Sequence, residues 1–344
     1  MNIDMKAWAK KNVILLFLIL LVLGFGVTTS QFFTTWRISD IFTTSPFFTS
    51  MNLINLTTQM AINAMLAAGL TYVIILGGID ISVGSVAALS GIVASVLARD
   101  VPVLSSTIPG SILILIGSAF VVGTICGSIN GIMITKFRVV PMIATLAMLT
   151  IARGLSFVVA DGTSVFGIPS AFSWLGAARL IATEDRPTGW IPVITLFVIF
   201  CVTIMAILLS KTVFGRHVYA TGSNRAVAHL GGINTGKVIL LGHIICSIAA
   251  AMGGALNASR LQSGQPAALD GFELFAIAAT VLSGTSLYGG VGSVGRAMFG
   301  VAIIAVINNG MNLLQVHSHW QRIVIGLIIL FAVALDMWQK KKKS

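Results

Sequence analysis

Apolar residues follow one another along this chain in long runs, which are interrupted by glycine, proline or charged residues. Each run is close to the ~20 residues that a helix needs to cross a bilayer, and too long for the ~10-residue alternating strands of a membrane barrel. In the hydrocarbon core such a run must satisfy its own backbone hydrogen bonds, which a helix does. The pattern predicts an all-α polytopic membrane protein with about ten transmembrane helices, over the approximate ranges 13–33, 53–76, 81–98, 111–130, 139–160, 191–209, 238–258, 273–288, 297–315 and 322–338.

The composition excludes a water-soluble protein. Of the 344 residues, 56% are hydrophobic and only 9% are charged, and the mean hydropathy is +0.99. A soluble domain carries about 25% charged residues. Ten spans leave no room for a separate soluble domain, so we interpret residues 1–344 as a single transmembrane domain without a fused ATPase, kinase or receptor head.

The basic residues indicate how the helices are oriented. A net charge of +11 would indicate a nucleic-acid partner in a soluble protein, but here it reports membrane orientation, and we expect no nucleic acid. With the N-terminus inside, fourteen Lys and Arg residues fall in cytoplasmic segments and six in external ones, which predicts both termini in the cytoplasm. The basic start resembles a signal peptide, but it lacks the small-residue cleavage pattern, so we assign the run from Val13 to the first helix. The tail from Lys340 to Lys343 is expected to be attracted to anionic membrane lipid.

Two connections between the predicted helices are longer than the others. The external one, about 161–190, contains glycine, proline and charges of both signs. The internal one, about 210–237, has a helix-forming centre from Asn224 to Leu230, which Gly231 and Gly232 would end. We therefore expect a short helix lying on the cytoplasmic face.

Two glycine motifs resemble nucleotide sites but lack the setting that such sites need. Residues 231–237 match GxxxxGK, but Val238 replaces the Ser or Thr that would hold magnesium, and no strand precedes them. Residues 290–295 match GxGxxG, but they connect two apolar helices and no acidic residue follows ~20 positions later. We interpret the second motif as a tight glycine turn at the cytoplasmic ends of two spans, and we expect no nucleotide, metal or other cofactor in this chain.

Small and amide side chains within the spans allow two interpretations. Gly123, Gly127 and Gly131 recur every four residues, which favours close helix packing but also suits the lining of a pathway. Amide side chains are costly against lipid, so they either hydrogen-bond between helices or line a pathway. The spans contain such amides at Asn130, Asn308 and Asn309.

Two charged residues lie within or beside the spans. Arg153 is expected to pair inside the bundle, to extend toward the interface, or to contact a substrate. Asp80 lies between the second and third spans, where it or Ser82 is suited to cap the third helix.

Six motifs occur in a fixed order along the chain. They are GGIDISVGS (77–85), NG (130–131) followed by Lys136 and Pro141, TLAMLTIARG (145–154), FGRHVYATGSN (214–224), LGGIN (230–234) and LSGTSLYGGVGSVG (282–295). From about residue 50 to 337 the chain resembles the membrane permease subunits of bacterial ATP-binding-cassette importers for ribose, galactose and similar monosaccharides. The resemblance implies a second permease copy or paralogue, a cytoplasmic ATPase on a separate polypeptide, and a periplasmic or lipid-anchored sugar-binding protein.

In such importers a cytoplasmic helix between two spans sits in a groove of the ATPase and transmits its closure. The permease itself carries out no covalent chemistry, so the resemblance implies a transport subunit of the bacterial inner membrane and not an enzyme. It assigns the coupling role here to Phe214, Gly215, Arg216, Asn224, Ala226, Ala228, Gly231, Gly232 and Ile233.

Alternating access of the permease pair is the mechanism that the resemblance implies. We expect a pathway along the dimer axis, lined by Gly78, Asp80, Ser82, Gly84, Asn130, Arg153, Asn308 and Asn309. In such importers the binding protein supplies most of the sugar selectivity, so the resemblance implies no cluster of Asp, Asn, Arg and Trp suited to gripping a sugar. The alternative is a stand-alone secondary transporter or channel for a small polar solute, which tends to place ionisable residues at mid-membrane; apart from Asp80 at a span end, we identify no such acid in the sequence.

Overall fold

The computed structural model describes residues 13–30, 42, 44–182, 189–317, 319–328 and 330, and this part of the chain is built almost wholly from helices. Seven of its helices are long and apolar enough to cross a membrane: α5 (Ser50–Ile75), α6 (Val83–Asp100), α8 (Ile108–Thr135), α9 (Pro141–Val159), α11 (Val193–Lys211), α14 (Thr235–Leu261) and α16 (Val294–Leu313). There are two shorter apolar helices, α2 (Val13–Thr29), which packs against α16, and α15 (Phe272–Leu282). The prediction of an all-α polytopic membrane protein is confirmed.

These nine helices correspond to nine of the predicted spans. The tenth predicted span, 322–338, falls largely outside the described residues, although residues 319–328 are helical. The basic N-terminal start, the end of the first predicted span and the Lys340 to Lys343 tail also lie outside them.

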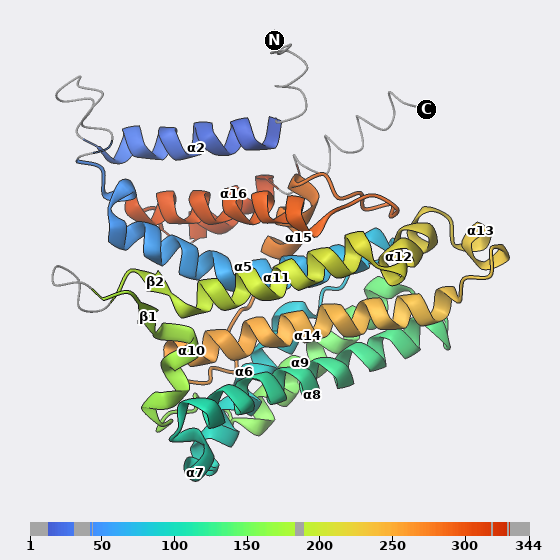
Figure 1. Cartoon of the computed structure of the whole chain (residues 1–344), viewed down its shortest axis with the longest axis horizontal. Coiled ribbons are helices and arrows are strands. Elements are labelled where there is room, and N and C mark those ends of the chain that lie inside the picture. The colour runs from blue at the N-terminus through green and yellow to red at the C-terminus, as the bar shows by residue number, and fades with distance from the viewer. Residues whose placement is uncertain are drawn as a thin grey trace, which may run out of the picture.

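The apolar helices run side by side, with α14 in the middle of the bundle (Figure 1). It packs against α8, α6 and α5. The contact between α8 and α14 depends on glycine: a Cβ atom at Gly127 would lie 2.6 Å from Ile244 Cα and 2.7 Å from the His243 carbonyl oxygen. Gly123 and Gly131 meet the α14 backbone in the same way. The interpretation of this glycine face as a close helix contact is confirmed.

A helical hairpin of α12 (Val213–Ser223) and α13 (Arg225–Leu230) projects from one end of the bundle (Figure 1). The expected helix from Asn224 to Leu230 is thereby confirmed, whereas α12 was not predicted. At the same end lie the α5–α6 loop (residues 76–82) and the α15–α16 turn (residues 283–293). We call this the basic end, because most of the basic residues of the described connections gather there.

The opposite end holds several short elements, which are α7 (Pro102–Ser105), η1 (Pro46–Phe48), η2 (Ser170–Ser173), α10 (Trp174–Ala177) and a hairpin of β1 (Arg179–Leu180) and β2 (Ile191–Pro192). Most of them belong to the long connection that was expected at about 161–190. In that connection Gly176 donates its amide hydrogen to Ser259 Oγ at 2.9 Å, which fixes α10 to the end of α14.

After α14 the chain folds back into the bundle. A Cβ atom at Gly264 would lie 2.7 Å from Ser95 Cβ, and one at Gly84 would lie 2.8 Å from the Leu269 carbonyl oxygen. Gly84 and Ser95 are eleven residues apart on α6, which corresponds to about 16 Å along a helix. Residues 262–271 are therefore a re-entrant segment.

The re-entrant segment explains why one predicted span is wrong in extent. We expected a helix over 273–288, but α15 (Phe272–Leu282) has only 11 residues. Because the segment before it already covers part of the membrane thickness without helix, α15 starts within the bundle and has only the remaining depth to cross.

Candidate functional site

The α5–α6 loop carries the GGIDIS motif and is closed by side-chain hydrogen bonds. Ser82 donates to Asp80 Oδ1 from its amide at 2.9 Å and from its hydroxyl at 2.6 Å. Asn130 Nδ2 on α8 donates to Ser82 Oγ at 3.2 Å. Thr145 Oγ1 on α9 donates to the Ile79 carbonyl at 3.1 Å. The loop is therefore held between α8 and α9.

The prediction that Asp80 or Ser82 caps α6 is wrong in its detail. Ser82 occupies the N-cap position but makes no side-chain bond to a helix amide, because its hydroxyl donates to Asp80. Asp80 is fully buried, and its Oδ1 accepts from the amide of Ser82, which precedes the first residue of α6. Its second oxygen, Oδ2, has no hydrogen-bond partner among the described residues. A buried carboxylate with one unpaired oxygen is costly in a purely structural loop, which marks this loop as a site of interest.

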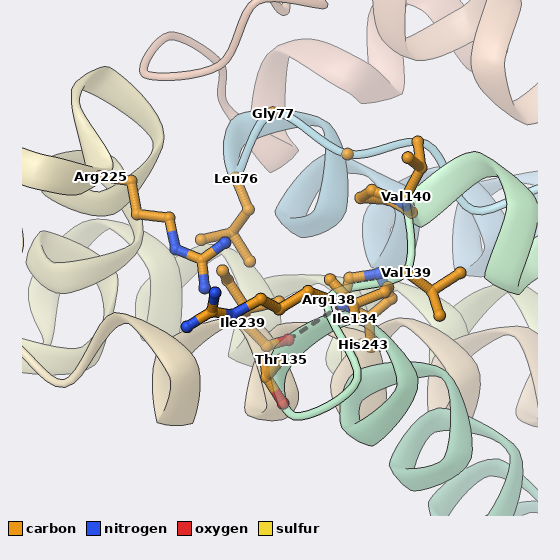
Figure 2. A pocket seen from close by; sticks show the side chains of 12 residues that line it. Leu76, Gly77, Ile134, Thr135, Arg138, Val139, Val140, Arg225, Ile239 and His243 are labelled. Atoms are coloured by element: carbon orange, nitrogen blue, oxygen red, sulfur yellow. Dashed lines mark hydrogen bonds between the residues drawn. The ribbon is translucent and has the colours of Figure 1, made fainter.

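A cavity of about 590 Å³ lies beside this loop at the basic end (Figure 2). Gly78 lines it, together with Thr135, Arg138, Arg225 and His243. Figure 2 shows the guanidinium groups of the two arginines extending toward the same space. Among the described residues that line the cavity there are two arginines and no carboxylate, so the space is electropositive. We call it the inner cavity.

The predicted glycine turn at the basic end is confirmed, and it connects three elements. Gly290 has a φ of +74°, which favours glycine, and its amide donates to the Ile75 carbonyl at the end of α5 at 2.8 Å. On α12, Tyr219 donates its hydroxyl hydrogen to the Gly292 carbonyl at 2.9 Å. Burial raises the pKa of Tyr219 above its ordinary value. A Cβ atom at Gly222 would lie 2.9 Å from the Gly290 nitrogen. We call this contact of α12, α5 and the α15–α16 turn the inner joint.

The helical hairpin beyond the inner joint presents apolar side chains to its surroundings. Asn224 caps α13, because its Oδ1 accepts from the amides of Ala226 at 3.0 Å and Val227 at 3.1 Å. Val227 is 62% exposed and Leu230 is 86% exposed. Gly232 has a φ of +83°, which reverses the chain toward α14. A capped helix whose apolar tip is exposed is suited to a protein contact.

The predicted coupling residues divide into two groups. Phe214 stacks on Tyr72 of α5 with ring centroids 6.4 Å apart, and Ala228 is buried. Gly215 is also buried and Ile233 is half-buried, so this group anchors the hairpin. The exposed group comprises Arg216, Asn224, Ala226, Gly231 and Gly232.

At the other end of the predicted pathway, Arg153 binds the re-entrant segment. Its Nη1 donates to the carbonyls of Pro266 and Ala268, both at 2.8 Å. Its Nη2 lies 3.9 Å from Oδ1 of the exposed Asp270. Of the three alternatives for Arg153, the structure shows pairing inside the bundle, with the re-entrant backbone as partner. Gly84 likewise lies directly against this segment, at the Leu269 carbonyl.

The two neighbouring asparagines of α16 have different surroundings. Asn309 and Asn52 exchange two amide hydrogen bonds, of 2.9 Å and 2.8 Å, and so connect α16 to α5. Asn308 lines a second cavity instead. An interhelical hydrogen bond therefore accounts for Asn309, and a bond to the α5–α6 loop accounts for Asn130, but neither accounts for Asn308.

Replacing Asn309 with Leu is expected to destabilise the protein by about 1 to 3 kcal/mol, because the amide of Asn52 loses both hydrogen bonds to Asn309 and keeps only the one that it donates to the Phe47 carbonyl. In the double variant Asn52→Leu/Asn309→Leu no amide is left unpaired, so the loss should be smaller than the sum of the two single losses. Thermal unfolding of the purified protein in detergent measures all three variants. Strictly additive losses would contradict the pairing.

The second cavity, of about 340 Å³, was not predicted from the sequence, although Asn308, one of the residues that line it, was named as a pathway residue. We expected no cluster of side chains suited to gripping a sugar. The structure brings polar residues from α5, the re-entrant segment, α14, α16 and the helical residues 319–328 around one space: Gln59, Asn63, Asn257, Arg260, Asp270, Asn308, Asn312, Gln321 and Arg322. We call it the outer cavity.

The fold and the site define a multi-pass α-helical membrane protein with an intramembrane re-entrant segment and a projecting helical hairpin, which is the architecture of a membrane permease. The chain belongs to the family described as the permease component of the branched-chain amino acid transport system, which matches residues 52–333. The expected resemblance to permeases of ATP-binding-cassette importers is confirmed. The chain is a multi-pass protein of the inner membrane.

Among its relatives are permeases named for sugars. The chain is 41% identical over 302 residues to the ribose import permease protein of Bacillus subtilis strain 168, covering 87% of each chain. It is 38% identical to the ribose import permease protein of Escherichia coli K12, covering 87% of this chain and 90% of the relative. With the L-arabinose transport system permease protein of the same strain it shares 32% identity over 86% of each chain. No solved structure is a significant match.

Proposed function

We propose that the chain is the membrane permease subunit of an ATP-driven importer that moves a monosaccharide, ribose or a related sugar, across the inner membrane by alternating access. Relatives named for ribose, allose and arabinose support the substrate class. The observation that carries the mechanism is the helical hairpin, whose apolar tip is exposed while its base is hydrogen-bonded to the inner joint.

The arrangement of charge supports an orientation with the basic end in the cytoplasm. Arg138, Arg225 and the helical hairpin all lie at that end. An even number of about ten spans would then place both termini in the cytoplasm as well. In this orientation the hairpin faces a cytoplasmic ATPase, and the opposite end faces a periplasmic sugar-binding protein. A second permease copy or paralogue would complete the complex, with membrane lipid around it.

The inner joint connects the helical hairpin to helices inside the membrane. The α15–α16 turn hydrogen-bonds to Ile75 at the end of α5. Tyr219 of α12 hydrogen-bonds to the same turn. The α5–α6 loop follows directly and lines the inner cavity. Movement of the hairpin on closure of the ATPase would therefore displace the α5–α6 loop, which changes access to the pathway from the cytoplasmic side.

ATP hydrolysis by the assembled importer tests this proposal. The chain is combined with its ATPase and binding protein in lipid nanodiscs, and hydrolysis is measured against a panel of monosaccharides. We expect one sugar, or a few related ones, to stimulate hydrolysis only when the binding protein is present. Equal hydrolysis with every sugar and with none would contradict a sugar-coupled permease.

A further inference from the structure

The outer cavity lies where five parts of the chain meet near the end opposite the helical hairpin. Its polar lining comes from α5, α14, α16, the re-entrant segment and the helical residues 319–328, and Phe272 and Phe275 of α15 add two aromatic rings. Its volume of about 340 Å³ is near the lower limit of small-molecule sites, which range over ~300–1,000 Å³. A space of this size suits a small solute.

Two polar atoms beside this cavity have no partner in the described part of the chain. Asn63 is only 8% exposed, and its Oδ1 has no hydrogen-bond partner. Arg260 Nε is also buried and unpaired. Asn257, 6% exposed, receives one bond of 3.3 Å from Arg260 Nη2. Because buried polar groups are normally satisfied, unpaired atoms at a cavity indicate that another molecule completes them.

The backbone around the cavity is also of the kind that lines transport sites. The re-entrant segment places non-helical backbone within the bundle, which membrane proteins tolerate where that backbone is buried in protein or lines an aqueous space. Asp270 of this segment and Phe272 at the start of α15 both line the outer cavity. In transporters, substrate sites form at such breaks between helices.

The chemistry of the lining matches a polyhydroxylated solute. Amides donate and accept hydrogen bonds, a carboxylate accepts them, and guanidinium groups donate them, so the set can satisfy hydroxyl groups, which do both. The rings of Phe272 and Phe275, whose centroids are 5.4 Å apart, offer apolar surface to the C–H faces of a sugar ring. Asp270 is exposed, so it can turn toward a ligand in the cavity.

We propose that the outer cavity is a monosaccharide-binding site within each permease subunit, where the amides of Asn63 and Asn257 hydrogen-bond to sugar hydroxyls after the binding protein releases its cargo. This inference rests on the proposed function. It gives the permease a selectivity of its own, in addition to that of the binding protein.

The test uses the assembled importer and the sugar that it transports, together with deoxy analogues that each lack one hydroxyl. Uptake into proteoliposomes is measured for the native chain, for Asn63→Leu and for Asn257→Leu. Asn55→Leu is the matched control, because Asn55 is exposed on the same helix as Asn63 and lines a different cavity. Should Asn63→Leu fail to assemble, Asn308→Leu in the same cavity is measured in its place.

We expect the cavity variants to transport the natural sugar about fivefold to tenfold less efficiently, the effect of losing one hydrogen bond. Stimulation of ATP hydrolysis by the loaded binding protein should persist. For one deoxy analogue the difference between native and variant should disappear, because the lost hydroxyl and the lost amide are partners. Asn55→Leu should behave as the native chain.

Two outcomes would overturn the inference while leaving the proposed function intact. One is transport by the cavity variants at the native rate. The other is an equal loss for the natural sugar and all deoxy analogues, which a structural defect produces. If the native importer transports no sugar at all, the proposed function itself is wrong.

Discussion

Replacing Leu230 with Asp is expected to lower ATP-driven transport by a factor of about 100. Leu230 is 86% exposed at the tip of the helical hairpin and makes no contribution to the core, so the folded chain should tolerate the change. In the assembled importer the side chain would enter an apolar contact with the ATPase, and a charge there costs about 2 to 3 kcal/mol, the effect of losing an interface hot spot. Co-purification of the ATPase with the permease and stimulated ATP hydrolysis measure the loss.

The matched control for this substitution is Val103→Asp. Val103 is 89% exposed on α7, at the opposite end of the bundle. It should leave binding of the ATPase unchanged, since it lies on the other side of the membrane in the proposed orientation. Normal co-purification and normal stimulation in the Leu230→Asp variant would show that the hairpin is not the coupling element.

Replacing Gly127 with Leu is expected to prevent assembly of the helix bundle. A Cβ atom at this position would lie 2.6 Å from Ile244 Cα and 2.7 Å from the His243 carbonyl oxygen. Both are backbone atoms of α14, so no side-chain rotation relieves the clash, and the two helices must separate. We expect the free energy of unfolding to fall by about 4 kcal/mol or more, which exceeds the 1 to 3 kcal/mol that is typical of overpacking. Thermal unfolding in detergent, with size-exclusion profiles, measures the loss.

Gly117→Leu is the control for the packing prediction. Gly117 lies on the same helix, α8, and no atom of the described part of the chain lies within 4 Å of a Cβ atom added there. Its unfolding temperature should change little. If both substitutions lowered the unfolding temperature equally, the loss would come from a general effect of leucine on α8. It would then not come from the contact between α8 and α14.

The sequence predicted the features that depend on neighbouring residues. Long apolar runs predict membrane helices because the bilayer requires them, and nine of these helices are present in the described residues. The helix at Asn224 was predictable because a capping residue and a pair of glycines bound it. The glycine turn at Gly290 was predictable because two apolar runs flank it.

Features that depend on distant residues could not be predicted in the same way. Asn309 pairs with Asn52, 257 positions earlier, and no local pattern indicates such a partner. The outer cavity combines residues from Gln59 to Arg322, each of which looks like an isolated polar residue in its own helix. The re-entrant segment was missed because hydropathy does not distinguish a short helix followed by a turn from a complete span.

Uptake of a labelled monosaccharide into proteoliposomes tests the central claim most directly. The chain is reconstituted alone, and also with its ATPase and binding protein, with and without ATP. The account predicts accumulation of sugar only by the complete complex with ATP. Accumulation by the isolated chain, driven by a proton or sodium gradient without the ATPase, would contradict it and identify a secondary transporter.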